Sequence, residues 1–209
     1  MQTDPNMQLA QANLRNLARN PYPGRGIVAG LDETGGYMVQ VYWIMGRSEN
    51  SRNRVFKADD DIGNIGRLYT EAADSSKVKD PSLIIYNAMR EGRDCAVVSN
   101  GKQTDDVTEK GMISLRRYQY EPDGPNFTPR ITACAFWERD RGEWRVVMSV
   151  LRKSLWSDAF DHLVYELNEL GRGLGYCVTT YSGNGNPLPA FRGEPYLLPL
   201  VGDAPAVAR

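Results

Sequence analysis

Apolar and polar residues alternate with a period of two over much of the chain, and this pattern predicts β-strands. Residues 27–31 and 37–45 are apolar and flank a polar, glycine-containing turn at 32–36, which predicts a hairpin. The second strand of this hairpin is apolar on both faces, so we expect it to lie between packed layers. Residues 131–137 and 144–150 alternate in the same way around a charged turn and predict a second long hairpin. Shorter strands are expected at 95–99, 176–181 and 196–201.

The beginning of the chain has the apolar spacing of a helix instead. The first twenty residues predict a modestly amphipathic helix that ends before Pro21 and Pro23. We therefore interpret residues 1–20 as a helical extension to a single domain of residues 21–209. Two further short helices are expected, one around residues 83–90 and one that opens at Thr104 and is interrupted by Gly111.

Residues 157–170 predict a fourth helix, because their apolar side chains fall on one helical face between an N-cap at Ser157 and a terminal Gly171. The glycine run at 171–175 has G-x-G-x-G spacing and follows this helix rather than a strand. We interpret it as a helix end and not as a dinucleotide-binding loop. His162, the only histidine in the sequence, lies beside the apolar face. We expect a partly exposed helix residue without a catalytic role.

The three cysteines do not indicate a disulfide framework or a zinc site. They are Cys95, Cys134 and Cys177, which lie far apart in the sequence and form no C-x-x-C pair. We expect them to be buried thiols.

Composition places the chain among ordinary globular proteins, with 209 residues, 41% hydrophobic and 24% charged. The expected strands outnumber the expected helices, and strands and helices do not alternate regularly along the chain. This pattern predicts an α+β domain with mostly antiparallel sheet. The formal charge of −1 excludes a net positive field for nucleic acid or anionic lipid. Because no apolar run approaches the ~18 residues of a membrane span and no secretory signal pattern is present, we expect a soluble, cytoplasmic protein.

A polar loop at residues 46–54 directly follows the buried strand and is the first of three candidate clusters. It carries Arg47, Arg52 and Arg54, whose planar guanidinium groups suit phosphate or carboxylate. The alternative is a solvated loop whose charges face water.

The second cluster lies where a predicted strand ends and a helix begins. Ser99, Asn100 and Gly101 precede Thr104 and Asp105, and such a corner can bind an anion or a ribose through N–H and hydroxyl groups. An ordinary turn with a helix cap is at least as consistent with the same residues.

The third cluster is the stretch 120–124 with the Thr-Pro-Arg sequence at 128–130. Glu121 and Asp123 can supply a general acid and base, although a Pro-Asp-Gly sequence is normally only a turn. Tyr86 lies among leucine and isoleucine residues, so packing is its default role.

Together these clusters resemble the archaeal-type IMP cyclohydrolase family, over roughly residues 22–133. The resemblance implies the four-layer αββα sandwich of N-terminal nucleophile hydrolases, without the chemistry of those enzymes. The matching motifs are Tyr22-Pro23-Gly24-Arg25, Asn53-Arg54, Tyr86-Asn87, the stretch 96–101 with Thr104-Asp105, and Tyr120-Glu121 ahead of 128–131.

The resemblance also implies an activity, the ring closure of 5-formamidoimidazole-4-carboxamide ribonucleotide to IMP with loss of water, the last step of de novo purine biosynthesis. Such an enzyme belongs with the hydrolases of cyclic amidines and needs no cofactor and no metal. Its implied partners are the purine nucleotide substrate and further copies of itself, with neither nucleic acid nor membrane. The alternatives are a purine-nucleotide-binding module that has lost the activity and a related amide-cyclising or amide-hydrolysing enzyme on the same scaffold.

Residue by residue, the resemblance implies that Arg54 holds the carboxamide or the developing oxyanion, Tyr86 donates or relays a proton, and Glu121 orients water or acts as base. These groups can carry out the reaction without a histidine, because the reaction is intramolecular and needs chiefly positioning and proton transfer. The implied substrate-binding residues are Arg25, Arg47 and Arg130 for the phosphate, Asn100, Gly101, Thr104 and Asp105 for ribose or base, and the motif residues Asn53, Asn87 and Ser99.

Overall fold

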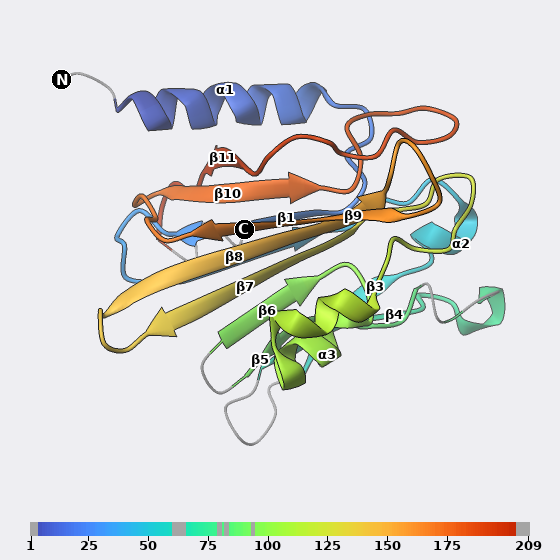
Figure 1. Cartoon of the computed structure of the whole chain (residues 1–209), viewed down its shortest axis with the longest axis horizontal. Helices are drawn as coiled ribbons and strands as arrows, with labels where there is room; N and C mark the ends of the chain where they lie inside the picture. Colours follow the sequence, from blue (N-terminus) through green and yellow to red (C-terminus); the bar gives the residue numbers. More distant parts are fainter. Residues whose placement is uncertain (1–3, 60–65, 79–80, 82–83, 93–94, 204–209) are drawn as a thin grey trace.

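The computed structural model describes residues 4–59, 66–78, 81, 84–92 and 95–203, which form two packed antiparallel sheets with helices on their outer faces (Figure 1). One sheet has four strands in the order β11-β10-β1-β2, and the other has seven in the order β3 to β9. The strands are β1 (Gly26–Leu31), β2 (Met38–Trp43), β3 (Val55–Asp59), β4 (Arg67–Glu71), β5 (Asn87–Glu91), β6 (Cys95–Ser99), β7 (Arg130–Glu138), β8 (Glu143–Lys153), β9 (Phe160–Leu167), β10 (Leu174–Thr179) and β11 (Tyr196–Pro199). The helices are α1 (Pro5–Arg19), α2 (Glu49–Arg52) and α3 (Gln103–Lys110), with 3₁₀ turns η1 (Ser75–Lys77) and η3 (Met112–Arg117).

Three apolar clusters separate the layers. The largest lies between the two sheets and contains Ile27 of β1 and Ile131 and Met148 of β7 and β8. A second cluster lies on the outer face of the four-stranded sheet, where Leu17 of α1 packs against it. A third lies on the outer face of the seven-stranded sheet, beneath Val107 of α3. The order of layers is therefore helix, sheet, sheet, helix, and the predicted α+β class with mostly antiparallel sheet is confirmed.

Successive side chains of a strand point to opposite faces of the sheet, so one strand contributes to two apolar clusters. In β7, Ile131, Ala133 and Ala135 face the space between the sheets, whereas Cys134 faces α3. Both predicted hairpins are present, and β1 pairs with β2 as β7 pairs with β8. The predicted strands near 95–99, 176–181 and 196–201 are also confirmed as β6, β10 and β11.

The predicted N-terminal helix is present as α1, where the Asp4 side chain accepts a hydrogen bond from the backbone N–H of Asn6. The short helix predicted from Thr104 is α3, and it ends at Gly111, which has a φ of 75°. Cys134 and Cys177 are buried thiols as expected, and Cys95 is half-buried. In the described residues, no helix is long and apolar enough to cross a membrane.

The helix predicted at 157–170 is wrong, because this segment contains β9. Helical spacing of its apolar residues is outweighed by pairing with β8, in which Leu167 lies opposite Val146 and Tyr165 opposite Met148. Both Leu167 and Tyr165 pack against the core between the sheets. The glycine run at 171–175 therefore leads into β10, which contains its last two residues, and does not end a helix; His162 lies on β9.

The helix predicted around residues 83–90 is also wrong, because Asn87–Glu91 forms β5 between β4 and β6; residues 82 and 83 lie outside the described residues. Strands β3 and β4 were not predicted at all. Most side chains of β3 are exposed, so its sequence has no alternating burial pattern, and the strand is set by its pairing with β4. In both cases tertiary pairing decides the structure.

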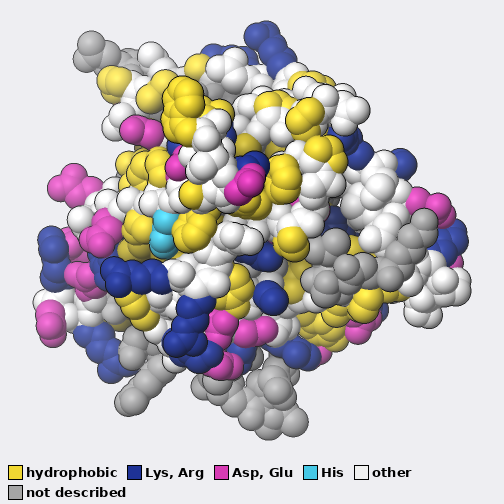
Figure 2. Space-filling view, turned by 45° about the vertical axis from the view of Figure 1, so that its right-hand side comes forward, with side chains coloured by type: hydrophobic (Ala, Val, Ile, Leu, Met, Phe, Trp, Pro, Cys, Tyr) yellow, Lys and Arg dark blue, Asp and Glu magenta, His cyan; other side chains and the backbone are white. Residues whose placement is uncertain are grey.

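The surface has no large field of one charge sign on the face shown in Figure 2. Lysine and arginine side chains are interspersed there with aspartate and glutamate, and hydrophobic side chains are more frequent in the upper half. This distribution agrees with the formal net charge of −1.

Candidate active site

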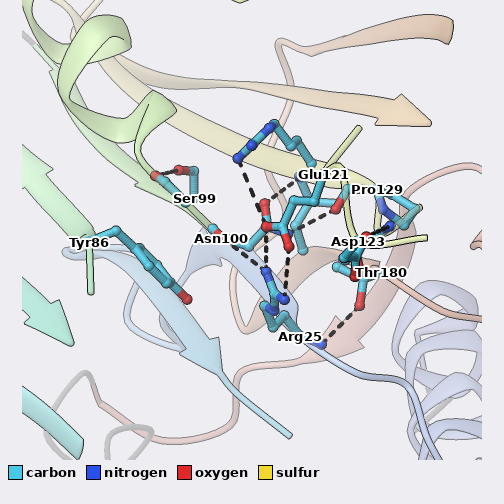
Figure 3. Close-up of polar contacts among 12 residues, drawn as sticks. Arg25, Tyr86, Ser99, Asn100, Glu121, Asp123, Pro129 and Thr180 are labelled. Atoms are coloured by element: carbon cyan, nitrogen blue, oxygen red, sulfur yellow. Dashed lines mark hydrogen bonds and ion pairs between the residues drawn. The ribbon is translucent and has the colours of Figure 1, made fainter. Parts of the chain in front are cut away.

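A buried ion pair between Arg25 and Glu121 lies at the centre of the candidate site (Figure 3). Nη1 and Nη2 of Arg25 donate to Oε1 and Oε2 of Glu121 at 2.7 and 3.2 Å, and Nη1 also donates to the carbonyl of Asn100 at 3.1 Å. The side chains of Arg25 and Glu121 are only 12% and 6% exposed. Burial lowers the pKa of the Arg25 guanidinium, but the charge of Glu121 and the neighbouring Tyr86 and Tyr42, together with the hydrogen bonds to Glu121, raise that pKa well above its ordinary value.

The backbone on either side fixes this pair. Gly24, immediately before Arg25, has a φ of 73°, and a Cβ there would lie 2.3 Å from Oγ1 of Thr180. That oxygen accepts a hydrogen bond from the backbone N–H of Arg25 at 3.0 Å. Glu121 is held by its own N–H, which donates to the carbonyl of Thr128 at 2.8 Å. The turn before β1 and the loop before β7 are thereby brought together.

Two further arginines interact electrostatically with this ion pair. Nη1 of Arg130, the first residue of β7, lies 3.9 Å from Oε1 of Glu121 and donates to Oε1 of Gln103 at 2.9 Å. Arg54 follows α2, and its Nε donates to the carbonyl of Ser51 at 2.9 Å. Burial lowers the pKa of both the Arg54 and the Arg130 guanidinium, and the positive charge of Arg25 lowers each further. The excess of guanidinium over carboxylate gives this cluster the chemistry that suits an anionic or strongly polar ligand.

Nη1 of Arg54 is buried and, among the described residues, has no hydrogen-bond partner. A buried donor without an acceptor is costly, by about 1 to 3 kcal/mol and more when it is charged. Such atoms are rare in folded proteins and often mark the position of a ligand or a water. This nitrogen is therefore positioned to donate to a bound molecule.

Two tyrosine hydroxyls form a pair between the sheets. The hydroxyl oxygen of Tyr42, on β2, lies 2.7 Å from that of Tyr86, the residue immediately before β5. Both side chains are buried, and Figure 3 shows the Tyr86 ring directed toward the Arg25–Glu121 pair. Burial, then the neighbouring Tyr86, raises the pKa of Tyr42 well above its ordinary value. If the neutral Tyr42 donates within the pair, the proton of Tyr86 is free to be donated to a ligand.

A cavity of about 200 Å³ opens beside Arg25 and Arg54. Its wall includes Asp123, whose Oδ1 accepts the backbone N–H of Thr128 at 2.7 Å. Burial raises the pKa of Asp123. The hydroxyl of Thr128 is hydrogen-bonded both to Asp123 and to the hydroxyl of Tyr181, so these side chains form one connected polar wall.

A family model described as IMP cyclohydrolase-like protein matches residues 22–195. The chain belongs to this family. A search of curated proteins finds no match. The matched range contains every side chain of the site just described and extends well beyond residue 133, where the resemblance noted in the sequence ends, whereas α1 lies before it. In the described residues, no group of three or more His, Cys, Asp or Glu side chains is arranged to hold a metal ion.

The structure brings together one part of the residues that the sequence suggested for this cyclohydrolase-like site. Asn100 contributes its carbonyl to Arg25, while its side chain donates to the carbonyl of Pro129 at 2.8 Å. At Gly101, a Cβ would lie 2.6 Å from Nη1 of Arg130, so the absent side chain leaves room for that guanidinium. The suggested residues gathered around the cavity and the ion pair are Arg25, Arg47, Arg54, Tyr86, Asn100, Gly101, Glu121 and Arg130.

Another part lies on the opposite face of the seven-stranded sheet, against α3. The hydroxyl of Ser99 is hydrogen-bonded to that of Thr104, and Figure 3 shows the Ser99 side chain turned away from the ion pair. Nδ2 of Asn87 donates to Oδ1 of Asp105 at 2.7 Å. These polar pairs join α3 to the strands beneath it and do not face the cavity.

Asn53 and Arg47 have partners of different kinds. The Asn53 amide exchanges two hydrogen bonds of 2.7 Å with the backbone of Asp74, so it fixes the loop that carries Arg54. Nη1 of Arg47 donates to Oδ1 of Asn184 at 2.9 Å and to the carbonyl of Gly185 at 2.7 Å, at the rim of the cavity.

The sequence did not point to Tyr42 or Tyr181 as site residues, and it placed Thr128 in the third cluster without giving it a role. A tyrosine in the middle of a buried strand needs a partner for its hydroxyl, and this is the one signal that Tyr42 carries. Asp123 was noted only as one half of a possible acid and base pair. Tyr181 belongs to the C-terminal part of the chain, where the motifs do not extend.

Proposed function

We propose that this protein is an IMP cyclohydrolase, which closes the purine ring of 5-formamidoimidazole-4-carboxamide ribonucleotide to form IMP and water. The observation that carries the proposal is the unpaired, buried Nη1 of Arg54 beside the Arg25–Glu121 ion pair and the Tyr42–Tyr86 hydroxyl pair. The family match supports the same reaction. The helix-sheet-sheet-helix order supports the further proposal that the fold is the sandwich of N-terminal nucleophile hydrolases.

The reaction joins the carboxamide nitrogen to the formyl carbon of the same molecule. One hydrogen leaves the carboxamide nitrogen, one leaves the formamido nitrogen, and the formyl oxygen departs with both as water. Because both reacting groups belong to one substrate, holding them in a reactive conformer supplies a large part of the acceleration. The protein then has to stabilise charge on the formyl oxygen and to move protons.

Arg54 is suited to the formyl oxygen. Its buried Nη1 donor has no protein acceptor among the described residues, and its Nε is anchored to the carbonyl of Ser51. A donor that is fixed in advance stabilises developing negative charge without reorganisation.

Tyr86 is suited to donate the proton that turns this oxygen into a leaving water, with Tyr42 orienting its hydroxyl at 2.7 Å. Glu121 is suited to accept the proton of the carboxamide nitrogen. A carboxylate has about four lone-pair positions, and the Arg25 fork uses two of them. The remaining positions can accept from the substrate.

For the phosphate we propose Arg47 and Arg130, the arginines at the rim of the cavity and beside Glu121. A cavity of about 200 Å³ holds only part of a nucleotide, so the phosphate must extend toward the opening. Arg25 donates three hydrogen bonds to Glu121 and Asn100 and has a positioning role in this scheme.

The proposal is tested by incubating the metal-free protein with the formamido ribonucleotide and following IMP by chromatography. We expect IMP to form above the buffer blank. If no IMP forms while AMP or IMP still raises the melting temperature, the site is a nucleotide-binding site without this activity and the enzyme assignment fails. Turnover of a related ureido or amido compound alone would favour a different amide-cyclising enzyme.

Separate removal of the Tyr86 and the Tyr42 hydroxyl tests the role proposed for each. We expect Tyr86→Phe to lower kcat by roughly 10² or more, with KM changed only a few-fold, because it removes the proton donor. Tyr42→Phe should lower kcat by about tenfold, since Tyr42 acts through Tyr86. Tyr37→Phe, at a tyrosine that is 61% exposed, is the matched control and should leave both constants unchanged. A rise in KM with kcat intact in Tyr86→Phe would contradict the proton role.

A further inference from the structure

A second and larger cavity lies at the C-terminal end of α1, on the outer side of the four-stranded sheet. Its volume is about 430 Å³, against about 200 Å³ for the cavity beside Arg54. Small-molecule sites in proteins occupy roughly 300 to 1,000 Å³. The wall combines α1 and the turn after it with the end of β10 and the segment that leads into β11. No role in the proposed reaction accounts for this cavity.

One side of the cavity is aromatic and apolar. The rings of Phe191 and Tyr196 lie with their centroids 6.1 Å apart and their planes at 50°, and Leu17 of α1 lies on the same wall. Both rings are half-buried, so part of each is available to a ligand. Surfaces of this kind bind flat ring systems by stacking and edge contacts.

The other side of the cavity carries asparagine and arginine side chains, which can form hydrogen bonds to the polar edge of a ring. Nδ2 of Asn13 donates to the carbonyl of Leu197 at 3.0 Å, which fixes this amide with its oxygen still available. Within the described part of the chain, the side chains of Asn16 and Arg19 have no hydrogen-bond or ion-pair partner. Amides supply both donors and acceptors, which is what the edge of a heteroaromatic base requires.

The charge of the cavity selects for an anion. Arg19 contributes a guanidinium, and none of the described residues that line the cavity is acidic. A guanidinium without a protein carboxylate is a ready partner for a phosphate. We infer that this cavity is a second ligand site, which binds a nucleoside monophosphate with its base against Phe191 and Tyr196 and its phosphate at Arg19.

The same segments line both cavities. The turn after α1 forms part of the second cavity and continues into Tyr22 and Arg25, while Thr179 precedes Thr180 and Tyr181. Tyr22 and Tyr181 stack with ring centroids 5.8 Å apart, and both line the cavity beside Arg54. A ligand in the second cavity therefore contacts the segments that hold Arg25 in place.

The test measures AMP binding by titration calorimetry to the full-length protein in an Arg54→Ala background, which removes the unpaired donor of the first site. We expect AMP to bind this variant at one site per chain. Adding Asn16→Ala and Arg19→Ala should weaken that binding at least tenfold. Arg15→Ala, on the same helix but outside the cavity, is the matched control and should not change it. Ribose 5-phosphate, which lacks the base, should bind at least tenfold more weakly than AMP.

Hydrogen exchange provides a second measurement that does not depend on the variants. AMP should slow exchange of backbone amides in residues 13–21 and near Phe191 in the wild-type chain. Absence of AMP binding to the Arg54→Ala protein, or binding that the Asn16 and Arg19 substitutions leave unchanged, would overturn the inference. Because both readouts measure binding, failure of the ring-closure assay would leave this result standing, and the reverse also holds.

Discussion

Arg54→Lys is expected to lower kcat/KM for ring closure by roughly 10² to 10³, which is the usual effect of removing one preorganised donor at a developing oxyanion. Lysine keeps the positive charge but lacks the planar fork. In the native protein, Nε of Arg54 donates to the carbonyl of Ser51 while the buried Nη1 stays unpaired. The single ammonium group of lysine cannot both donate to the carbonyl of Ser51 and direct a second donor at the substrate.

The measurement is a steady-state comparison of kcat and KM, with Arg52→Lys as the control. Arg52 belongs to α2, two residues earlier, and its exposed guanidinium donates to the carbonyl of Arg47 at 3.0 Å. The control should keep nearly full activity. If Arg54→Lys also keeps it, the unpaired nitrogen does not contact the reacting atoms, and the role proposed for Arg54 is wrong.

Glu121→Gln is expected to lower the free energy of unfolding by about 3 to 5 kcal/mol, since it removes one partner of a buried ion pair and leaves the other charge uncompensated. Arg25, Arg54 and Arg130 all interact electrostatically with Glu121, and their positive charges would then lose its compensating negative charge. Urea denaturation near neutral pH measures the loss. The double variant Arg25→Gln with Glu121→Gln should recover part of the stability, because it removes the uncompensated charge of Arg25.

Glu138→Gln is the matched control for this prediction. Its carboxylate accepts a hydrogen bond from Nε of Arg145 at 2.7 Å, but these side chains are 33% and 27% exposed. Solvent screens such a pair, so the expected loss is below about 1 kcal/mol. Equal losses in Glu121→Gln and Glu138→Gln would show that burial does not set the strength of the Arg25 pair.

The sequence predicted strands correctly where the two paired strands are neighbours in the sequence. The two hairpins have alternating apolar residues and a turn between them, so their pairing needs no information from elsewhere. The strand β9 was predicted as a helix because its apolar residues also fit helical spacing. Its strand conformation depends on pairing with β8. β3 is mostly exposed and has the same dependence on its neighbour β4.

The motifs named residues of the candidate site, but they did not show which of these side chains face the cavity and the ion pair. Neighbouring residues of an extended segment point to opposite faces, so Tyr86 faces the space between the sheets while Asn87 faces α3. The resemblance named both residues, and only the fold separates them. Tyr42 was missed because its partner comes from the other sheet, 44 positions along the chain.

The candidate site is divided between the two sheets. Arg25 and Tyr42 come from the four-stranded sheet and the turn before it. Arg130 belongs to the seven-stranded sheet, and Tyr86 and Glu121 lie on segments that lead into its strands β5 and β7. The ion pair and the hydroxyl pair both cross this boundary. Neither sheet alone carries both halves of the candidate site, so the site exists only where the two sheets pack against each other.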